Sequence, residues 1–149
     1  MNISKTGFAK KNIQISNDIV YTAGFIIAQK VYRITKALYP EVGFIGGGVR
    51  GLHHFTEMVG ADVCITMNWQ GQAEELIKNN YPVVPRFFNN IPENYLDQLL
   101  TKVPEFKRAY FEDGLTIDEY EHYGPVDYFR QMFISAWENA LAVIDKEKS

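Results

Sequence analysis

The chain has 149 residues, a length that predicts one domain at about 100–200 residues per domain. Its apolar fraction of 46% and its aromatic fraction of 14% suffice for a packed core and argue against disorder. The formal net charge is −3, with acidic and basic residues interspersed. This charge pattern argues against a protein that binds nucleic acid through a broad positive face.

Cysteine content and apolar runs bear on the cellular compartment. Cys64 is the only cysteine, so an internal disulfide is impossible, and its apolar neighbours predict a core position. The first sixteen residues lack the apolar stretch of a signal peptide. The longest apolar stretch, AGFIIA, is far shorter than the roughly 18 residues that a membrane span needs. We therefore expect a soluble, cytoplasmic protein that binds neither membranes nor nucleic acid.

The N-terminal half is predicted to begin with a long helix. Residues 1–15 are mixed polar and basic, and we expect an irregular lead-in before a single domain over 16–149. A helix is predicted from Asp18 to Leu38, because apolar residues recur every three or four positions and Pro40 follows. The members of this apolar stripe are Ile19, Ala23, Ile26, Ile27, Val31, Ile34 and Leu38.

Two short apolar runs predict parallel strands. Val42–Gly46 and Asp62–Met67 are uninterrupted, as in strands that are buried on both faces of a sheet. Between them LHHFTEMV predicts a short helix that ends at Gly60, which completes a βαβ unit. The expected fold class is therefore α/β, mostly helical with two short parallel strands. Because a stable sheet usually needs three or more strands, we expect association that completes it.

The remainder of the chain is predicted to be helical. QGQAEELIKNN predicts a short helix, and YPVVPRFFNN predicts a proline-punctuated loop. Asn90 and Glu93 predict the capped start of a helix with an apolar face made of Leu96, Leu99, Leu100 and Val103. Thr116–Glu119 predicts a capping box, and Pro125 predicts the first turn of a final helix. The apolar stripe of that last helix is Val126, Phe129, Phe133, Trp137, Ala140 and Ile144.

The segment after the first strand has the composition of a phosphate-binding turn. Gly46, Gly47 and Gly48 follow an apolar strand and precede Arg50 and a helix start. Ligands of α/β folds bind at the carboxyl ends of strands, and a helix N-terminus favours an anion. The planar guanidinium of an arginine suits phosphate oxygens. The alternative is a tight turn that needs glycine, with Arg50 solvated. The spacing fits neither the Walker loop nor the dinucleotide fingerprint.

Polar and aromatic residues near this turn are candidates for the wall of a cleft. His53 and Glu57 are four residues apart and His54 and Glu57 are three apart, so each histidine is a neighbour of Glu57 on a helix. A metal site would need a third ligand, which no nearby residue supplies, and we expect no metal ion and no cofactor. His53 lines the cleft or has a structural role. Asn68 and Trp69 end the second strand, where Asn68 is a candidate to hydrogen-bond a polyol. Trp69 forms a wall of the cleft or packs in the core.

From Tyr21 to Asp145 the sequence resembles the C-terminal portion of the transaldolase family, class I aldolases built on a (β/α)8 barrel. The resemblance rests on a helix that leads into a strand ending in glycine, followed by small residues and Arg50. It continues with a short helix, the turn and strand VGADVCIT, and a closing helix, VDYFRQMFISAWENALAVIDK. The resemblance implies that this chain is part of a TIM barrel and contributes its last two strands.

The resemblance also implies sugar-phosphate chemistry. Enzymes of this family form a Schiff base between a lysine and a ketose phosphate and transfer a dihydroxyacetone unit to an aldehyde. The arginine of this turn holds the substrate phosphate in the family, which assigns that role to Arg50. The family commonly has serine where Gly48 stands.

A complete barrel needs about 250 residues, and the family's catalytic lysine and acid/base carboxylate lie on earlier strands. Neither predicted strand here contains a lysine, so we expect this chain to be inactive alone. Its expected partners are a sugar phosphate and a complementary N-terminal barrel half, supplied as a separate subunit or missing from a fragment. The alternative is a non-catalytic helical protein that binds an anionic metabolite or forms a homo-oligomer through exposed strands.

Overall fold

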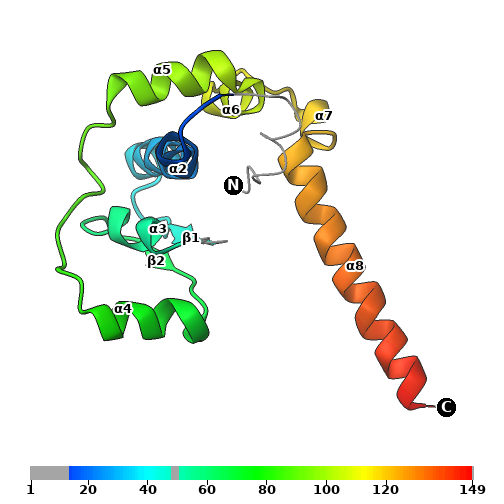
Figure 1. The fold of residues 1–149 in the computed structure, drawn as a ribbon. Helices are drawn as coiled ribbons and strands as arrows, with labels where there is room; N and C mark the ends of the chain where they lie inside the picture. The colour runs from blue at the N-terminus through cyan, green and yellow to red at the C-terminus, as the bar shows by residue number, and fades with distance from the viewer. Residues whose placement is uncertain (1–13, 48–50, 149) are drawn as a thin grey trace. The chain divides into compact units, whose positions relative to one another are not determined.

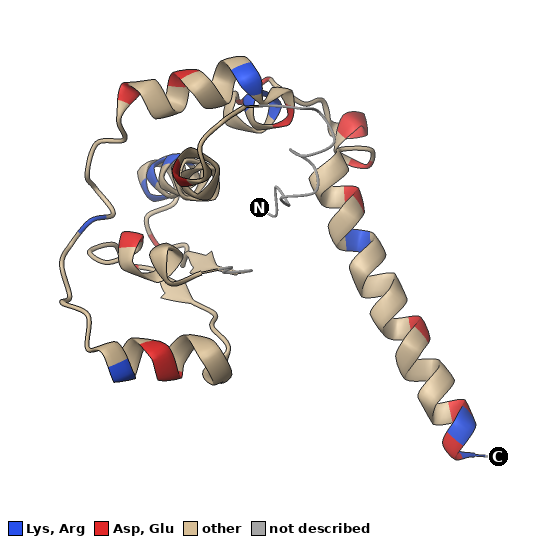
Figure 2. Cartoon of the chain, viewed as in Figure 1, with Lys and Arg blue, Asp and Glu red and all other residues tan. Residues whose placement is uncertain are grey.

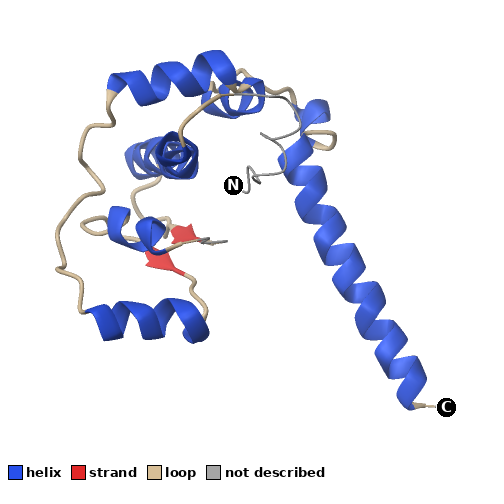
Figure 3. Cartoon of the chain, viewed as in Figure 1, coloured by secondary structure: helices blue, strands red, loops and turns tan. Residues whose placement is uncertain are grey.

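The structure is a computed structural model, and it describes residues 14–47 and 51–148. The chain divides into two compact units, Met1–Phe106 and Lys107–Ser149. Helices predominate, and the strands found among the described residues are two short parallel ones (Figure 3). The expectation of one domain over 16–149 stays a prediction. A domain is a unit that folds on its own, and division into compact units does not test independent folding. The expected lead-in lies almost entirely outside the described residues.

The first unit contains a helix, a βαβ segment and a second helical region (Figure 1). Its elements in chain order are α2 (Asn17–Leu38), β1 (Ile45–Gly46), α3 (Leu52–Glu57), β2 (Cys64–Ile65), η1 (Trp69–Ala73), α4 (Glu74–Asn79), α5 (Glu93–Lys102) and α6 (Pro104–Tyr110), the last of which continues into the second unit. The η1 segment is a kinked turn, since Gln70 and Gly71 have non-helical dihedral angles.

The two strands pair in parallel, as the sequence predicts. Ile45 lies opposite Cys64, and Gly46 lies opposite Ile65. The N–H of Cys64 donates to the carbonyl oxygen of Phe44 at 2.9 Å, and the N–H of Thr66 donates to that of Gly46 at 3.0 Å. Each strand has only two residues, however, whereas the apolar runs predicted five and six.

One face of this sheet is exposed. Ile45 is 72% exposed and its register partner Cys64 is exposed as well. The predictions that the strands are buried on both faces and that Cys64 lies in the core are therefore wrong. The physical reason is that α2 and α3 both pack on the opposite face, where Phe44, Met58 and Val63 join the core.

The core of this region contains an aromatic cluster of Phe25 and Tyr32 from α2 and Phe87 from the loop before α5. The ring of Phe87 is fully buried and meets the rings of Phe25 and Tyr32 edge to face, with centroids 5.7 Å and 4.9 Å apart. Prolines correctly predict a loop at this point of the chain, but nothing in its sequence predicts that it carries a core residue.

The buried face of α2 only partly matches the predicted stripe. Ile19, Ala23 and Ile26 are buried as expected. Val31 and Leu38 are exposed, whereas Gln29 and Tyr32 are buried in their place. The side chain of Gln29 donates to the backbone carbonyl oxygens of Phe87 and Asn89, which ties the loop to the helix.

Helix α5 packs against α2 and begins later than its predicted cap. Its N-cap residue is Pro92, which makes no side-chain cap, so the prediction that Asn90 caps this helix is wrong. Leu99 and Val103 of the predicted apolar face are buried, as is Phe106 in α6.

The second unit contains the short helix α7 (Ile117–Tyr120) and the long helix α8 (Gly124–Glu147). The predicted capping box is confirmed, because Thr116 and Glu119 exchange both hydrogen bonds. Arg108 forms an ion pair with Glu119 at 2.9 Å. Gly114 is required for packing, since a Cβ there would lie 2.1 Å from the carbonyl oxygen of Arg108.

The final helix begins with proline in its first turn, as predicted, but it buries none of its residues. Figure 2 shows that most of α8 carries no charged residue, with long uncharged stretches between the few charged positions. The exposed large apolar residues include Phe129, Phe133 and Trp137 of the predicted stripe. Within the described part of the chain, no helix combines the length and apolarity that a membrane crossing requires.

Candidate functional site

The predicted phosphate-binding turn lies at the carboxyl end of β1. Gly46 is the last residue of this strand, and Gly47 follows it. Gly48 and Arg50 lie outside the described residues. Helix α3 then begins at Leu52, and its N-cap residue Gly51 makes no side-chain cap. Because β1 and β2 are parallel, the carboxyl ends of both strands share this edge of the sheet, where α/β folds bind ligands.

The conformation at Gly46 and Gly47, the two described glycines of the triplet, does not itself require glycine. Among the described glycines, positive φ angles occur at Gly60 and Gly71 but not at Gly46 or Gly47. A Cβ at Gly47 would meet no atom within 4 Å, and one at Gly46 would make only ordinary contacts of 3.8–3.9 Å. Neither backbone strain nor crowding among the described residues therefore requires glycine at these two positions.

Two neighbouring histidines on α3 line two different cavities. His54 lines a cavity of about 250 Å³ together with Gly46, Gly47 and apolar residues of α2, whereas His53 lines one of about 420 Å³. Consecutive helical residues point in directions about 100° apart, which separates the two imidazoles. The histidine beside the strand end is thus His54, whereas His53, for which the sequence left a cleft-lining and a structural role open, lines the larger cavity.

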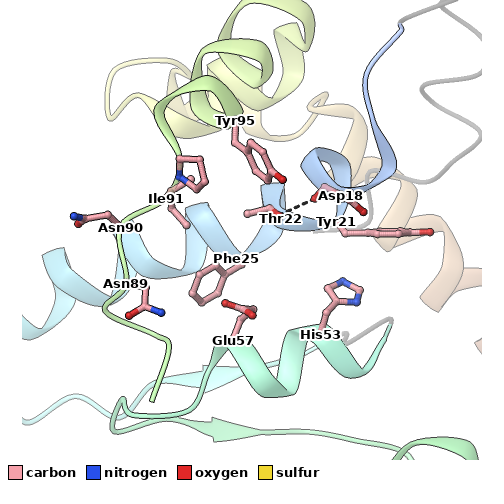
Figure 4. A pocket seen from close by; sticks show the side chains of 11 residues that line it. Asp18, Tyr21, Thr22, Phe25, His53, Glu57, Asn89, Asn90, Ile91 and Tyr95 are labelled. Atoms are coloured by element: carbon pink, nitrogen blue, oxygen red, sulfur yellow. Dashed lines mark hydrogen bonds between the residues drawn. The ribbon is translucent and has the colours of Figure 1, made fainter. Parts of the chain in front are cut away.

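The larger cavity lies between α2, α3 and the segment before α5 (Figure 4). Asp18 and Tyr21 come from α2 and Glu57 comes from α3, whereas Asn89 comes from the segment before α5 and Tyr95 from the first turn of α5. Figure 4 shows the side chains of His53 and Glu57 rising from α3 towards α2. Residues from 89 to 95 were not predicted for any site, because a sequence pattern does not reveal which helix a distant loop packs against.

Burial determines the ionisation of His53. The ring lies 5.0 Å from the ring of Tyr21, between centroids, and close to Gly51, where a Cβ would be 2.8 Å from the imidazole. Its Nε2 atom is buried and has no hydrogen-bond partner among the residues that the structure describes. Desolvation lowers the pKa of His53 below its ordinary value of 6.5, and the negative charge of Glu57 opposes this shift. The imidazole is therefore mostly neutral at pH 7.

Asn68 and Trp69 follow β2 but do not end it directly as predicted, because β2 stops at Ile65 and Trp69 begins η1. The N–H of Asn68 donates to the side-chain oxygen of Gln72 at 2.9 Å. Trp69 is 66% exposed, so the alternative that it packs in the core is wrong. Neither residue lines either of the two cavities described above.

No group of three or more histidine, cysteine, aspartate or glutamate residues that could hold a metal ion occurs in the described ranges, 14–47 and 51–148. Comparisons of the chain with protein-family models, with curated proteins and with solved structures find no match.

Proposed function

We propose that this chain is the C-terminal part of a transaldolase-like enzyme, in which it binds the phosphate group of a sugar phosphate. In this proposal Arg50 and the backbone of Gly46, Gly47 and Gly48 hold the phosphate. A complementary N-terminal barrel half supplies the lysine that forms the Schiff base with the ketose phosphate. The chain by itself does not transfer the dihydroxyacetone unit.

The observation that carries the proposal is the setting of the first two glycines. They lie at the carboxyl edge of a parallel strand pair, and neither their φ angles nor their neighbours require glycine. Glycine at position 47, just beyond the paired residues, leaves its backbone N–H group open to close approach by a ligand. The sequence places the guanidinium of Arg50 three residues beyond Gly47, where it adds a fixed positive charge.

The need for a partner follows from the sheet. Two strands of two residues each are too few for an independent sheet, and parallel sheets are normally covered on both faces. The uncovered face carries Ile45 and Cys64, the paired residues of β1 and β2. Further parallel strands on these edges would complete a barrel and would supply the residues that carry out the chemistry.

A binding experiment tests the phosphate site. Fructose 6-phosphate is titrated into the purified chain by calorimetry, with fructose as the uncharged control. We expect binding of the ester only, and Arg50→Ala should weaken it at least about tenfold, because a charge-assisted contact to phosphate is lost.

Gly47→Val should weaken binding of the ester without changing the far-UV circular dichroism spectrum, since there is space for a side chain. Arg33→Ala, on the exposed side of α2, is the matched control and should bind like the wild type. Equal affinities for wild type and Arg50→Ala would refute the assignment.

A second experiment tests the enzymatic part. The chain is mixed with a barrel half that carries a strand-borne lysine, and a ketose phosphate is trapped with borohydride. Trapping by the mixture, but not by this chain alone, is the expected result. If neither the mixture nor the chain alone traps the ketose phosphate, the enzymatic part of the proposal is refuted. The phosphate site is tested separately by the binding experiment.

The exposure of α8 supports one alternative, a self-associating helical protein without catalytic function. Its apolar side chains, Phe133 and Trp137 among them, are exposed along the whole helix. Measurement of the mass in solution, together with phosphate-ester binding, distinguishes a self-associating protein from a barrel half. A stable homo-oligomer that does not bind the phosphate ester would favour the alternative over a barrel half.

A further inference from the structure

The cavity of about 420 Å³ between α2, α3 and the segment before α5 is separate from the strand-edge turn. Its volume falls within the range of small-molecule sites, about 300–1,000 Å³. Phe25 lines both cavities, whereas Gly46 and Gly47 line only the smaller one. A ligand in the larger cavity would therefore not compete for the glycine backbone.

The charged side chains among the described residues that line this cavity are acidic. Asp18 and Glu57 both line it, and none of the residues described as lining it is a lysine or an arginine. Arg86 approaches Glu57, with 3.9 Å between the guanidinium and carboxylate atoms, but it does not line the cavity. The side chain of Glu57 remains 37% exposed, so its carboxylate is accessible to a ligand. Because His53 is mostly neutral at pH 7, it does not offset the two carboxylates.

The remaining walls suit a cation that has an apolar body. The rings of Tyr21, Phe25 and Tyr95 line the cavity, and aromatic faces attract ammonium and guanidinium groups. In Figure 4 the ring of Tyr95 descends from α5 and the carboxylate of Glu57 lies beside the ring of Phe25. Asn89 adds an amide oxygen that can accept a hydrogen bond from an N–H group.

We propose that this cavity is a second binding site, which takes a small organic cation such as a primary amine, with Glu57 and Asp18 as counter-ions and Phe25 and Tyr95 as apolar walls. A phosphate ester is disfavoured here, because two carboxylates would repel it. The proposal does not depend on the phosphate site.

Calorimetric titration of the full chain with 1,4-diaminobutane tests the proposal, with 1,4-butanediol as a neutral probe of the same length. We expect one diamine per chain and no binding of the diol. Glu57→Gln and Asp18→Asn should each weaken diamine binding about tenfold, as expected for the loss of a charge-assisted contact. Arg86→Gln should tighten it about twofold, because the competing partner of Glu57 is removed.

The control is Glu75→Gln, which removes one carboxylate from the exposed side of α4, outside the cavity. It should bind the diamine like the wild type. If Glu75→Gln weakens binding as much as Glu57→Gln, the diamine is responding to overall charge and the proposal fails. It also fails if the diol binds equally well, or if the Glu57 and Asp18 variants bind unchanged. Should one of these two variants not fold, the other variant and the gain expected from Arg86→Gln decide the result.

Discussion

Ile45 of β1 and Cys64 of β2 are register partners in a parallel sheet, and both side chains are exposed. The opposite face of the same sheet packs on α2 and α3 through Phe44 and Val63. A parallel sheet with one bare apolar face is unusual, because βαβ crossovers normally leave both faces covered. This asymmetry makes the bare face the natural place for a covering layer or a partner, and it can be tested directly.

The thiol of Cys64 should react with a maleimide in the native chain. Because its side chain is exposed, we expect one label per chain at a rate close to that of the unfolded chain, measured by mass spectrometry over time. The chain unfolded in guanidinium chloride provides the reference. Strong protection in a dilute native sample would contradict an open face. Protection that grows with protein concentration would instead mean that copies of the chain associate through it.

Substitutions on the two faces should differ sharply in their effect on stability. Ile45→Ser should change the free energy of unfolding by less than about 0.5 kcal/mol, as for other exposed positions. Phe87→Ala should cost about 3–5 kcal/mol, because it empties the fully buried site between Phe25 and Tyr32. Urea denaturation measures both values. A large loss in Ile45→Ser would mean that this residue is covered in solution.

Local sequence signals predict the elements better than they predict burial. The long helix, the βαβ order and the Thr116 capping box follow from periodicity and from residues near one another in the chain. The burial of Phe87 depends on a loop that packs against a helix more than fifty residues away in the sequence, which no local pattern encodes. Exposure of the α8 stripe likewise depends on what packs against the helix, and not on its periodicity.

The same distinction holds for the candidate sites. The sequence correctly places Gly46 and Gly47 at a strand end, because the apolar run and the glycines are adjacent in the chain. It indicates His53 and not His54 as a candidate for the cleft wall, but which cavity each histidine lines depends on where α2 lies relative to α3. The assignment of Arg50 stays a prediction, since it lies outside the described residues.

Gln29 should stabilise the loop that carries Phe87. Gln29→Leu removes the donor to the carbonyl oxygens of Phe87 and Asn89 and leaves the buried carbonyl of Phe87 without that bond. The expected cost is about 1–3 kcal/mol in the free energy of unfolding, measured by urea denaturation. Gln98→Leu is the control, because Gln98 only accepts an exposed hydrogen bond from Lys102 at 2.9 Å. Equal effects of the two substitutions would contradict a special role for Gln29.

The capping box should be detectable through Glu119. Hydrogen bonds from the backbone N–H and the hydroxyl of Thr116, with a smaller contribution from Arg108, lower the pKa of Glu119. Thr116→Ala should raise that pKa part of the way towards its ordinary value, because the hydroxyl is lost and the N–H remains. It should also weaken local helix stability by about 1 kcal/mol, the usual value of a cap, measured by hydrogen exchange in α7. Thr116→Ser keeps a hydroxyl and should resemble the wild type.

His53 should make stability depend on pH in the acidic range. Its pKa is lowered in the folded chain, so the unfolded chain binds more protons between the folded pKa and the ordinary value of 6.5. The free energy of unfolding should therefore rise as the pH rises through this range and fall on acidification. Substitution of His53 by asparagine removes this titration. The difference in stability between wild type and variant, measured by urea denaturation at several pH values, should shrink as the pH falls.

Glu57 allows a second test of what controls the pKa of His53. The negative charge of Glu57 raises the pKa of His53 against the effect of burial. Glu57→Gln removes the charge and keeps the shape, so the pKa of His53 should fall further. Titration of the imidazole Cε1 proton by NMR measures it in both proteins. If His53 titrated at or above 6.5, or if Glu57→Gln raised its pKa, then burial against Tyr21 would not be what controls this histidine.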